Sequence, residues 1–193
     1  MLKLKLETDP RWVNLAEKSL SEILTDHAYC EQKAATSCIS LIIVYPDLKP
    51  IVESLTPIVT EEWQHFATVL NEIYKRDFTL GYPRKDEYVN MLLKFQNKNG
   101  DRKDILVEKL LTNALIEARS CERFRLLSIG LKDDYFKKFY HNFMVSEAGH
   151  YRLFMDLAKL YKDKKKVDTR WHEYLEYEKE IFQKIEIRGD RMH

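Results

Sequence analysis

Residues 62–65 read Glu62-Trp63-Gln64-His65, and residues 147–150 read Glu147-Ala148-Gly149-His150. In an α-helix, residues three positions apart lie on one face about one turn from each other, so each stretch would present a carboxylate beside an imidazole. A single Glu-x-x-His pattern is weak evidence, because so short a motif often arises by chance. The second copy favours a metal site and requires both stretches to be helical.

A further glutamate precedes each stretch at nearly the same distance. Glu31 lies 31 positions before Glu62, and Glu117 lies 30 positions before Glu147. Corresponding residues of the two halves are therefore 85 or 86 positions apart, which indicates an internal twofold repeat. Glu122 is an alternative to Glu117, but Glu117 shares its helical face with apolar side chains and Glu122 shares its face with arginines. We therefore predict Glu117 as the ligand.

Helical patterns surround these residues. Asp9-Pro10 is typical of a helix start, and apolar residues then recur at helical spacing to Val44, as one helix or as two joined near residues 19–21. Residues 1–7 alternate leucine with charged residues and suit a short strand or an extended arm. Further helices are predicted at residues 56–76, starting at Thr56-Pro57, and at 85–96, 102–129, 133–161 and 169–185.

Four long helices with one extended connection in the middle predict an all-α, ferritin-like four-helix bundle with additional flanking helices. We expect residues 1–193 to form a single ferritin-like di-iron domain, since 193 residues suit one domain. The composition, with 45% apolar residues, five glycines and five prolines, favours long helices over a turn-rich β fold.

Charge and cysteine content narrow the function classes. The 32 basic and 31 acidic residues nearly cancel, so net charge indicates neither a nucleic acid nor a membrane surface as partner. Three cysteines without a C-x-x-C pair argue against a disulfide framework or a zinc ribbon and fit a reducing cytoplasm. The sequence holds no apolar run of about 18 residues, so we expect no membrane span.

The repeated residues predict a site for two divalent metal ions. Four buried carboxylates would repel one another and be costly to desolvate, but two divalent cations would neutralise them, with the two imidazoles neutral. Mixed oxygen and nitrogen ligands suit iron or manganese. His27, one turn before Glu31, is a candidate to hold that carboxylate from the second shell of the site. The predicted ligands are Glu31, Glu62, His65, Glu117, Glu147 and His150.

Longer motifs make the chain resemble a known family, the tRNA 2-methylthio-isopentenyl-adenosine hydroxylases. The resemblance is carried by residues 26–35 (DHAYCEQKAA), 115–124 (LIEARSCERF), 146–151 (SEAGHY) and 167–171 (VDTRW), and it covers nearly the whole chain after residue 8. It implies O₂-dependent hydroxylation of the isopentenyl group on a modified adenosine beside the tRNA anticodon. It also implies a non-haem centre of two iron ions, an external electron-donor protein and a catalytic role for the six predicted ligands.

A tRNA substrate would require basic surface residues. Lys164, Lys165, Lys166 and Arg170 form the densest basic cluster, and Arg119 and Arg123 are expected on the outer side of their helix. Both groups are candidates for phosphate contacts. A lysine-rich helix end that only complements the helix dipole is the alternative for the first group.

Two other functions remain open from sequence alone. A ferritin-like di-iron peroxidase or iron-handling protein would use the same ligands, although no cysteine pair offers a rubredoxin-like electron relay. A non-catalytic RNA-binding helical bundle with structural metal is the third hypothesis. It predicts RNA binding without oxygen consumption.

Overall fold

A computed structural model describes residues 3–193 of the chain. Within that range the structure has seven helices and no strand. Contacts between residues group into two compact units, one of Arg11–Lys85 with Arg188–Met192, and one of Asp86–Ile187 with the described part of Met1–Pro10 and with His193. The helices are α1 (Arg11–Lys18), α2 (Leu20–Val44), α3 (Lys49–Tyr74), α4 (Glu87–Phe95), α5 (Arg102–Gly130), α6 (Asp134–Tyr161) and α7 (Lys164–Lys184).

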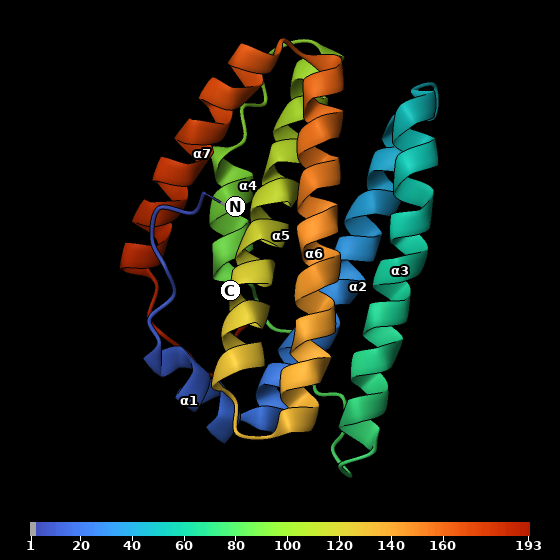
Figure 1. The fold of residues 1–193 in the computed structure, drawn as a ribbon. Helices are drawn as coiled ribbons and strands as arrows, with labels where there is room; N and C mark the ends of the chain where they lie inside the picture. Colours follow the sequence, from blue (N-terminus) through green and yellow to red (C-terminus); the bar gives the residue numbers. More distant parts are fainter. Residues whose placement is uncertain (1–2) are drawn as a thin grey trace. The chain divides into compact units, whose positions relative to one another are not determined.

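The unit of residues 11–85 is built on the helix pair α2 and α3, which run side by side in opposite directions (Figure 1). Their buried apolar residues recur at helical spacing, as in Leu24, Ala28 and Ala35 of α2. Short α1 packs against α2, and the indole of Trp12 donates to the carbonyl of Arg188 at 2.9 Å. This bond ties the segment of residues 188–192 to the same unit.

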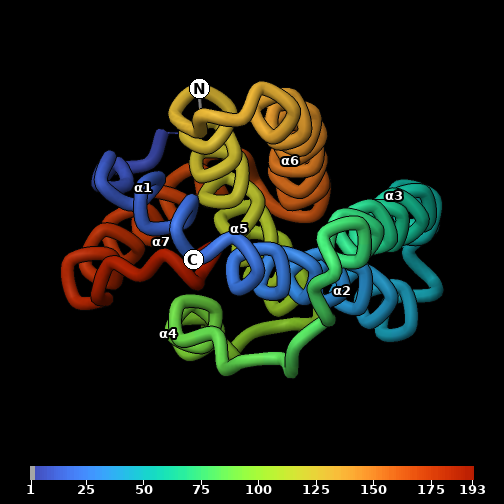
Figure 2. The backbone as a smooth tube through the Cα atoms, turned by 90° about the horizontal axis from the view of Figure 1, so that it is seen from below, coloured from blue at the N-terminus to red at the C-terminus, as the bar shows by residue number. Residues whose placement is uncertain are grey.

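The unit of residues 86–187 is built on the antiparallel pair α5 and α6. Viewed from the side and from below, α5 lies between α6 and α7 (Figures 1 and 2). Asp101 caps α5 by accepting from the backbone N–H groups of Lys103 and Asp104, and Asp133 caps α6 in the same way. Gly100, at φ +120°, supplies the left-handed turn before α5.

Most predicted helix bounds hold, and three details are new or wrong. The apolar pattern that follows Asp9-Pro10 forms two helices, α1 and α2, which is one of the two alternatives predicted for it. The start predicted at Thr56-Pro57 is wrong, because α3 begins at Lys49 and contains Pro57 in its interior. The last helix begins at Lys164, since Asp163 accepts hydrogen bonds from the backbone of Lys165 and Lys166 and caps it there.

Residues 3–7 of the N-terminal arm form no strand and bend at residues 5–6, whereas residues 1–2 lie outside the described part. Among residues 3–193 no helix is long and apolar enough to cross a membrane, as predicted. The prediction of one domain over residues 1–193 stays a prediction.

Candidate metal centre

The unit of α2 and α3 brings together three of the predicted ligands. Glu31 comes from α2, and Glu62 and His65 lie one turn apart on α3. The Nδ1 atom of His65 is 3.3 Å from Oε2 of Glu31 and 3.5 Å from Oε2 of Glu62. Both carboxylates are buried, at 4% and 1% exposed, and the His65 side chain is 16% exposed. Three metal-binding groups from two helices therefore converge within one small volume.

His27 orients one of these carboxylates. Its Nε2 atom lies 2.6 Å from Oε1 of Glu31, and the His27 side chain is fully buried. The oxygen that faces His65 is the other one, Oε2, so the two imidazoles contact opposite oxygens of Glu31. A hydrogen bond of this kind fixes the direction in which a carboxylate presents its remaining lone pairs.

The unit of α5 and α6 carries the other three predicted ligands. Glu117 lies on α5, and Glu147 and His150 lie one turn apart on α6. All three side chains are buried, and the Nδ1 atom of His150 is 3.2 Å from Oε2 of Glu147. The Glu-x-x-His pairs of the two units thus have the same internal geometry, as the repeat in the sequence predicts.

Aromatic side chains are buried on the same two helices, α5 and α6. Phe124 and Phe143 are buried with ring centroids 5.5 Å apart. The thiol of Cys121 donates to the carbonyl of Met144 at 3.3 Å. Burial, and then the charge of Glu147, raises the pKa of Cys121 to about 11. In the absence of metal, Cys121 is therefore a neutral thiol at pH 7.

Glu122, the alternative to Glu117 on α5, is bonded to residues outside the predicted ligand set. Glu122 accepts from the backbone N–H and the hydroxyl of Thr8, at 3.0 and 2.6 Å, and forms an ion pair with Arg119 at 3.0 Å. Both oxygens are used by the N-terminal arm and by this arginine. Of the two candidate ligands on α5, Glu117 and Glu122, these contacts favour Glu117.

The expected position of Arg119 and Arg123 on an outer face is wrong. Arg119 is fully buried, and its Nη2 and Nε atoms lie 2.5 and 2.8 Å from Oε1 of Glu178 on α7. Arg123 is also buried, and burial followed by the nearby charge of Arg119 lowers its pKa to about 9. The physical reason is that α7 and the N-terminal arm cover this side of α5. Arg119 therefore has no exposed surface, and Arg123 keeps only 6% of its own.

The predicted basic cluster of α7 is divided by the structure. The side chains of Lys164, Lys165 and Lys166 are exposed in the first turn of α7. Arg170 instead donates to Glu108 of α5 at 2.8 and 2.9 Å and to Glu173 at 2.5 Å. Its guanidinium also donates to the carbonyl of Phe95 at 3.0 Å, and it therefore ties α7 to α5 and to the end of α4.

Sequence analysis missed Glu108 and its contacts. Glu108 accepts from Arg170, from the hydroxyl of Tyr174 at 2.8 Å and from the backbone of Asn97 at 2.9 Å. Glu108 and Arg170 are 62 positions apart, and Glu108 belongs to none of the motifs that the sequence analysis singled out. Only the packing of α7 on α5 reveals this cluster.

Comparison with known proteins places the chain among hydroxylases. Residues 2–193 match the model of the family described as tRNA-(MS[2]IO[6]A)-hydroxylase (MiaE). A tRNA 2-(methylsulfanyl)-N(6)-isopentenyladenosine(37) hydroxylase of Pseudomonas putida is 34% identical, over 81% of this chain and 75% of that protein. The protein of the same name from Salmonella typhimurium is 25% identical, over 79% of this chain and 73% of its own length.

A solved structure extends the similarity to the fold. It is titled Protein 43 with aldehyde deformylating oxygenase activity, from Synechococcus, and it aligns with a TM-score of 0.92 at 29% identity. The alignment covers 98% of this chain and 94% of the other. The predicted all-helical, ferritin-like fold class is confirmed.

The donor set of each unit fits iron. Each unit buries carboxylate oxygens beside an imidazole nitrogen, which is the mixture that non-haem iron prefers. The ferritin-like fold and the buried Glu/His clusters together fit a di-iron site. On the match over residues 2–193 and the identity to the Pseudomonas putida enzyme, the chain belongs to the tRNA-(MS[2]IO[6]A)-hydroxylase (MiaE) family.

Proposed function

We propose that this protein hydroxylates the isopentenyl group of 2-methylthio-isopentenyladenosine beside the anticodon of tRNA. The reaction consumes O₂ and uses two iron ions held by the six residues that the repeat predicts. The observation that carries the proposal is the duplicated cluster, in which each unit brings a Glu-x-x-His pair together with a glutamate of the neighbouring helix and buries both glutamates. The names of the family and of its relatives supply the substrate.

In this proposal both units contribute ligands to one site, which makes residues 1–193 a single di-iron domain. Glu31, Glu62 and His65 would hold metal from one unit, and Glu117, Glu147 and His150 from the other. Four carboxylates and two divalent cations give a neutral cluster, which removes the cost of burying the carboxylates alone. The bound iron pair would supply the activation of O₂, which no amino-acid side chain can supply.

The chain's own residues position the ligands and keep the surroundings dry. His27 holds Oε1 of Glu31, so this carboxylate has one orientation before any metal binds. Phe124 and Phe143 are buried in the unit that carries Glu147 and keep water away from it. Exclusion of water protects a reactive oxidant and favours insertion of oxygen into a C–H bond of an apolar isopentenyl group.

Two partners complete the proposal. Reduction of O₂ by a di-iron site requires electrons, and the sequence has no glycine-rich nucleotide-binding motif, so we assign the electrons to an external donor protein. The tRNA substrate suits a cytoplasmic location. Both assignments remain predictions.

The experiment combines iron, tRNA and oxygen. The protein is loaded anaerobically with ferrous iron, mixed with tRNA that carries the methylthio-isopentenyl adenosine, and supplied with reductant and O₂. Mass spectrometry of the digested tRNA then measures the mass of the modified nucleoside. We expect a gain of one oxygen. An unchanged nucleoside, with two irons verified per chain, would remove the proposed substrate and turn attention to peroxide reduction and iron handling.

Matched variants test whether the reaction needs the proposed ligands. Glu147→Gln keeps the size of the side chain but removes its charge, so it should abolish hydroxylation. Asp156→Asn makes a similar change at an exposed position of the same helix and should leave the reaction intact. If Glu147→Gln retains hydroxylation, the ligand assignment is wrong. RNA binding without oxygen consumption in the wild-type protein would support the structural-metal hypothesis instead.

A further inference from the structure

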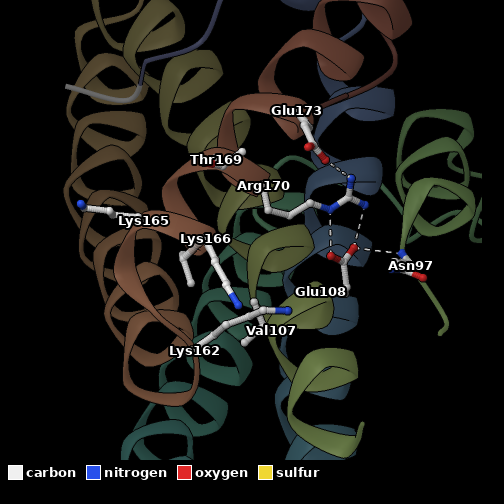
Figure 3. Close-up of a pocket in the computed structure, with 10 residues that line it drawn as sticks. Asn97, Val107, Glu108, Lys162, Lys165, Lys166, Thr169, Arg170 and Glu173 are labelled. Carbon is white, nitrogen blue, oxygen red and sulfur yellow. Dashed lines mark hydrogen bonds and ion pairs between the residues drawn. The ribbon is translucent and has the colours of Figure 1, made fainter. Parts of the chain in front are cut away.

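A pocket of about 540 Å³ lies where α7 begins beside α5 (Figure 3). Its side chains include four cations and two carboxylates, so the lining has a net positive charge. All of these residues belong to the unit of residues 86–187. The charged lining residues are Lys162, Lys165, Lys166, Arg170, Glu108 and Glu173.

The two carboxylates of the pocket both accept hydrogen bonds from one cation, Arg170. Arg170 donates to both oxygens of Glu108 and to Glu173, and its guanidinium lies 4.5 Å over the ring of Phe95. Arg170 therefore acts as an internal tether that shapes the wall of the pocket. The positive charge left for a ligand comes from the lysines.

Two lysines point toward the same part of the pocket. In Figure 3 the ammonium groups of Lys162 and Lys166 are directed to the region beside Val107, whereas Lys165 extends to the other side. Lys162 donates to Asp104 of α5, and the hydrogen bond from Lys162, with a smaller effect of Lys166, lowers the pKa of Asp104. Both ammonium groups thus lie near one carboxylate, which holds Lys162 in place.

The position of Lys164–Lys166 at the start of α7 is unfavourable for stability. The first turn of a helix carries the positive end of the helix dipole, where anions stabilise and cations destabilise. Lys164–Lys166 occupy that turn, which contains no acidic residue. The explanation that a lysine run complements the dipole requires a helix C-terminus, so it applies to Lys162, the C-cap residue of α6, but not to Lys164–Lys166. An anionic ligand would offset this cost.

We propose that this pocket binds a backbone phosphate of the tRNA substrate through Lys162 and Lys166. The inference rests on the proposed function, which makes tRNA the substrate. Glu108, at the pocket, precedes Glu117 by nine residues on α5, which corresponds to about 14 Å along the helix. A phosphate bound here would lie within a few nucleotides of a base that reaches the predicted ligands. The contact is independent of base identity and sets the position of the RNA.

The test measures binding of the modified tRNA to the full-length protein by fluorescence anisotropy over a series of salt concentrations. Lys166→Ala removes one proposed phosphate contact and should weaken binding roughly three- to tenfold at low salt, with a slope of log Kd against log salt that is smaller by about one. Lys164→Ala removes the same charge from the same helical turn, but Lys164 does not line the pocket. It should leave the affinity and the slope close to those of the wild-type protein.

Three outcomes are distinguishable. A selective effect of Lys166→Ala supports the pocket, and the double variant Lys162→Ala/Lys166→Ala should then lower the slope by about two. Equal behaviour of Lys166→Ala and Lys164→Ala overturns the pocket while leaving the proposed function in place, provided the wild-type protein adds oxygen to tRNA. Failure of the wild-type protein to bind or hydroxylate the tRNA overturns both. Thermal unfolding of each variant checks that lost binding does not reflect lost folding.

Discussion

The Nε2 atom of His27 lies 2.6 Å from the Oε1 atom of Glu31, and both side chains are buried. The offset of 86 positions that relates Glu31 to Glu117 aligns His27 with Asn113. An imidazole therefore supports the carboxylate in one unit, and an amide occupies the equivalent position in the other. The two proposed halves of the iron site have the same types of ligand, two glutamates and one histidine. They differ in the residue one turn before the first glutamate.

We predict that His27→Ala weakens iron binding at the half of the site that contains Glu31. Loss of a residue that orients a ligand typically lowers metal affinity 10- to 100-fold. Anaerobic titration of ferrous iron against a chromophoric chelator measures this, and the effect should fall on one of the two irons. His141→Ala, at an exposed position of α6, is the control. Wild-type affinity in His27→Ala would mean that Glu31 needs no support.

A second prediction concerns the stability of the metal-free protein. Glu62 is 1% exposed, and ionised carboxylates in one buried cluster raise the free energy of the folded state. Glu62→Gln should therefore raise the free energy of unfolding in chelator, by about 1–3 kcal/mol, and remove the stabilisation that ferrous iron gives the wild-type protein. Urea unfolding with and without iron measures both effects. If Glu62→Gln instead lowers the free energy of unfolding in chelator, the buried carboxylates do not destabilise the metal-free protein.

Glu178→Gln is the contrasting control for that experiment. Glu178 is also buried, but Arg119 neutralises it at 2.5 Å. Removal of its charge leaves the guanidinium without this counter-charge, so the same substitution should lower the free energy of unfolding.

The helices and the repeated ligands were predictable because both depend on local spacing. The pattern Glu-x-x-His places two side chains on one helical face, and the second copy with its preceding glutamate indicates a repeated set of ligands. In the structure α2 packs on α3 and α5 packs on α6. The predicted starts of α5 and α6 likewise lie within one residue of the observed starts, which Asp101 and Asp133 cap.

The misplaced arginines show what local spacing leaves out. Arg119 and Arg123 stand with Glu122 in a charged stripe of α5 that resembles an exposed face. That stripe is buried because α7 brings Glu178 to Arg119 from 59 positions away. Periodicity separates apolar from charged faces, but it does not show that a charged face is covered by another charged face of opposite sign.

A third prediction follows from the buried Arg119. Arg119→Met should lower the free energy of unfolding by about 3–5 kcal/mol, because Glu178 and Glu122 would both keep a buried negative charge that loses its main partner. Arg125→Met, at an exposed position of the same helix, should change the stability by less than about 0.5 kcal/mol. Chemical denaturation measures both. A small effect at Arg119 would mean that the carboxylates find other donors.

A fourth prediction concerns the dependence of stability on pH. Burial raises the pKa of Glu108, but hydrogen bonds from Arg170, Asn97 and Tyr174 outweigh it, so the pKa lies below the usual 4.5. A carboxyl group with a lowered pKa in the folded state stabilises that state above its unfolded pKa, and this contribution is lost as the pH falls through the folded value. Wild-type protein should therefore exceed Glu108→Gln in stability most at neutral pH, and the difference should shrink below pH 4.5. A difference that is constant from pH 7 to pH 3 would contradict the ionised pair.

The last prediction tests whether the basic first turn of α7 carries a stability cost. Lys164→Glu places an anion at the positive end of the helix dipole and should raise the free energy of unfolding by about 0.3–1 kcal/mol. Lys184→Glu makes the same substitution in the last turn, where a cation is favourable, and should lower it. Both variants change the net charge by the same amount. If urea unfolding shows that one raises the free energy of unfolding and the other lowers it, the difference is due to the helix dipole. Since a gain at Lys164 means that the lysine run opposes folding, its presence then requires a reason other than stability. The tRNA phosphate proposed for Lys162 and Lys166 is such a reason, whereas equal losses at both ends would remove this support.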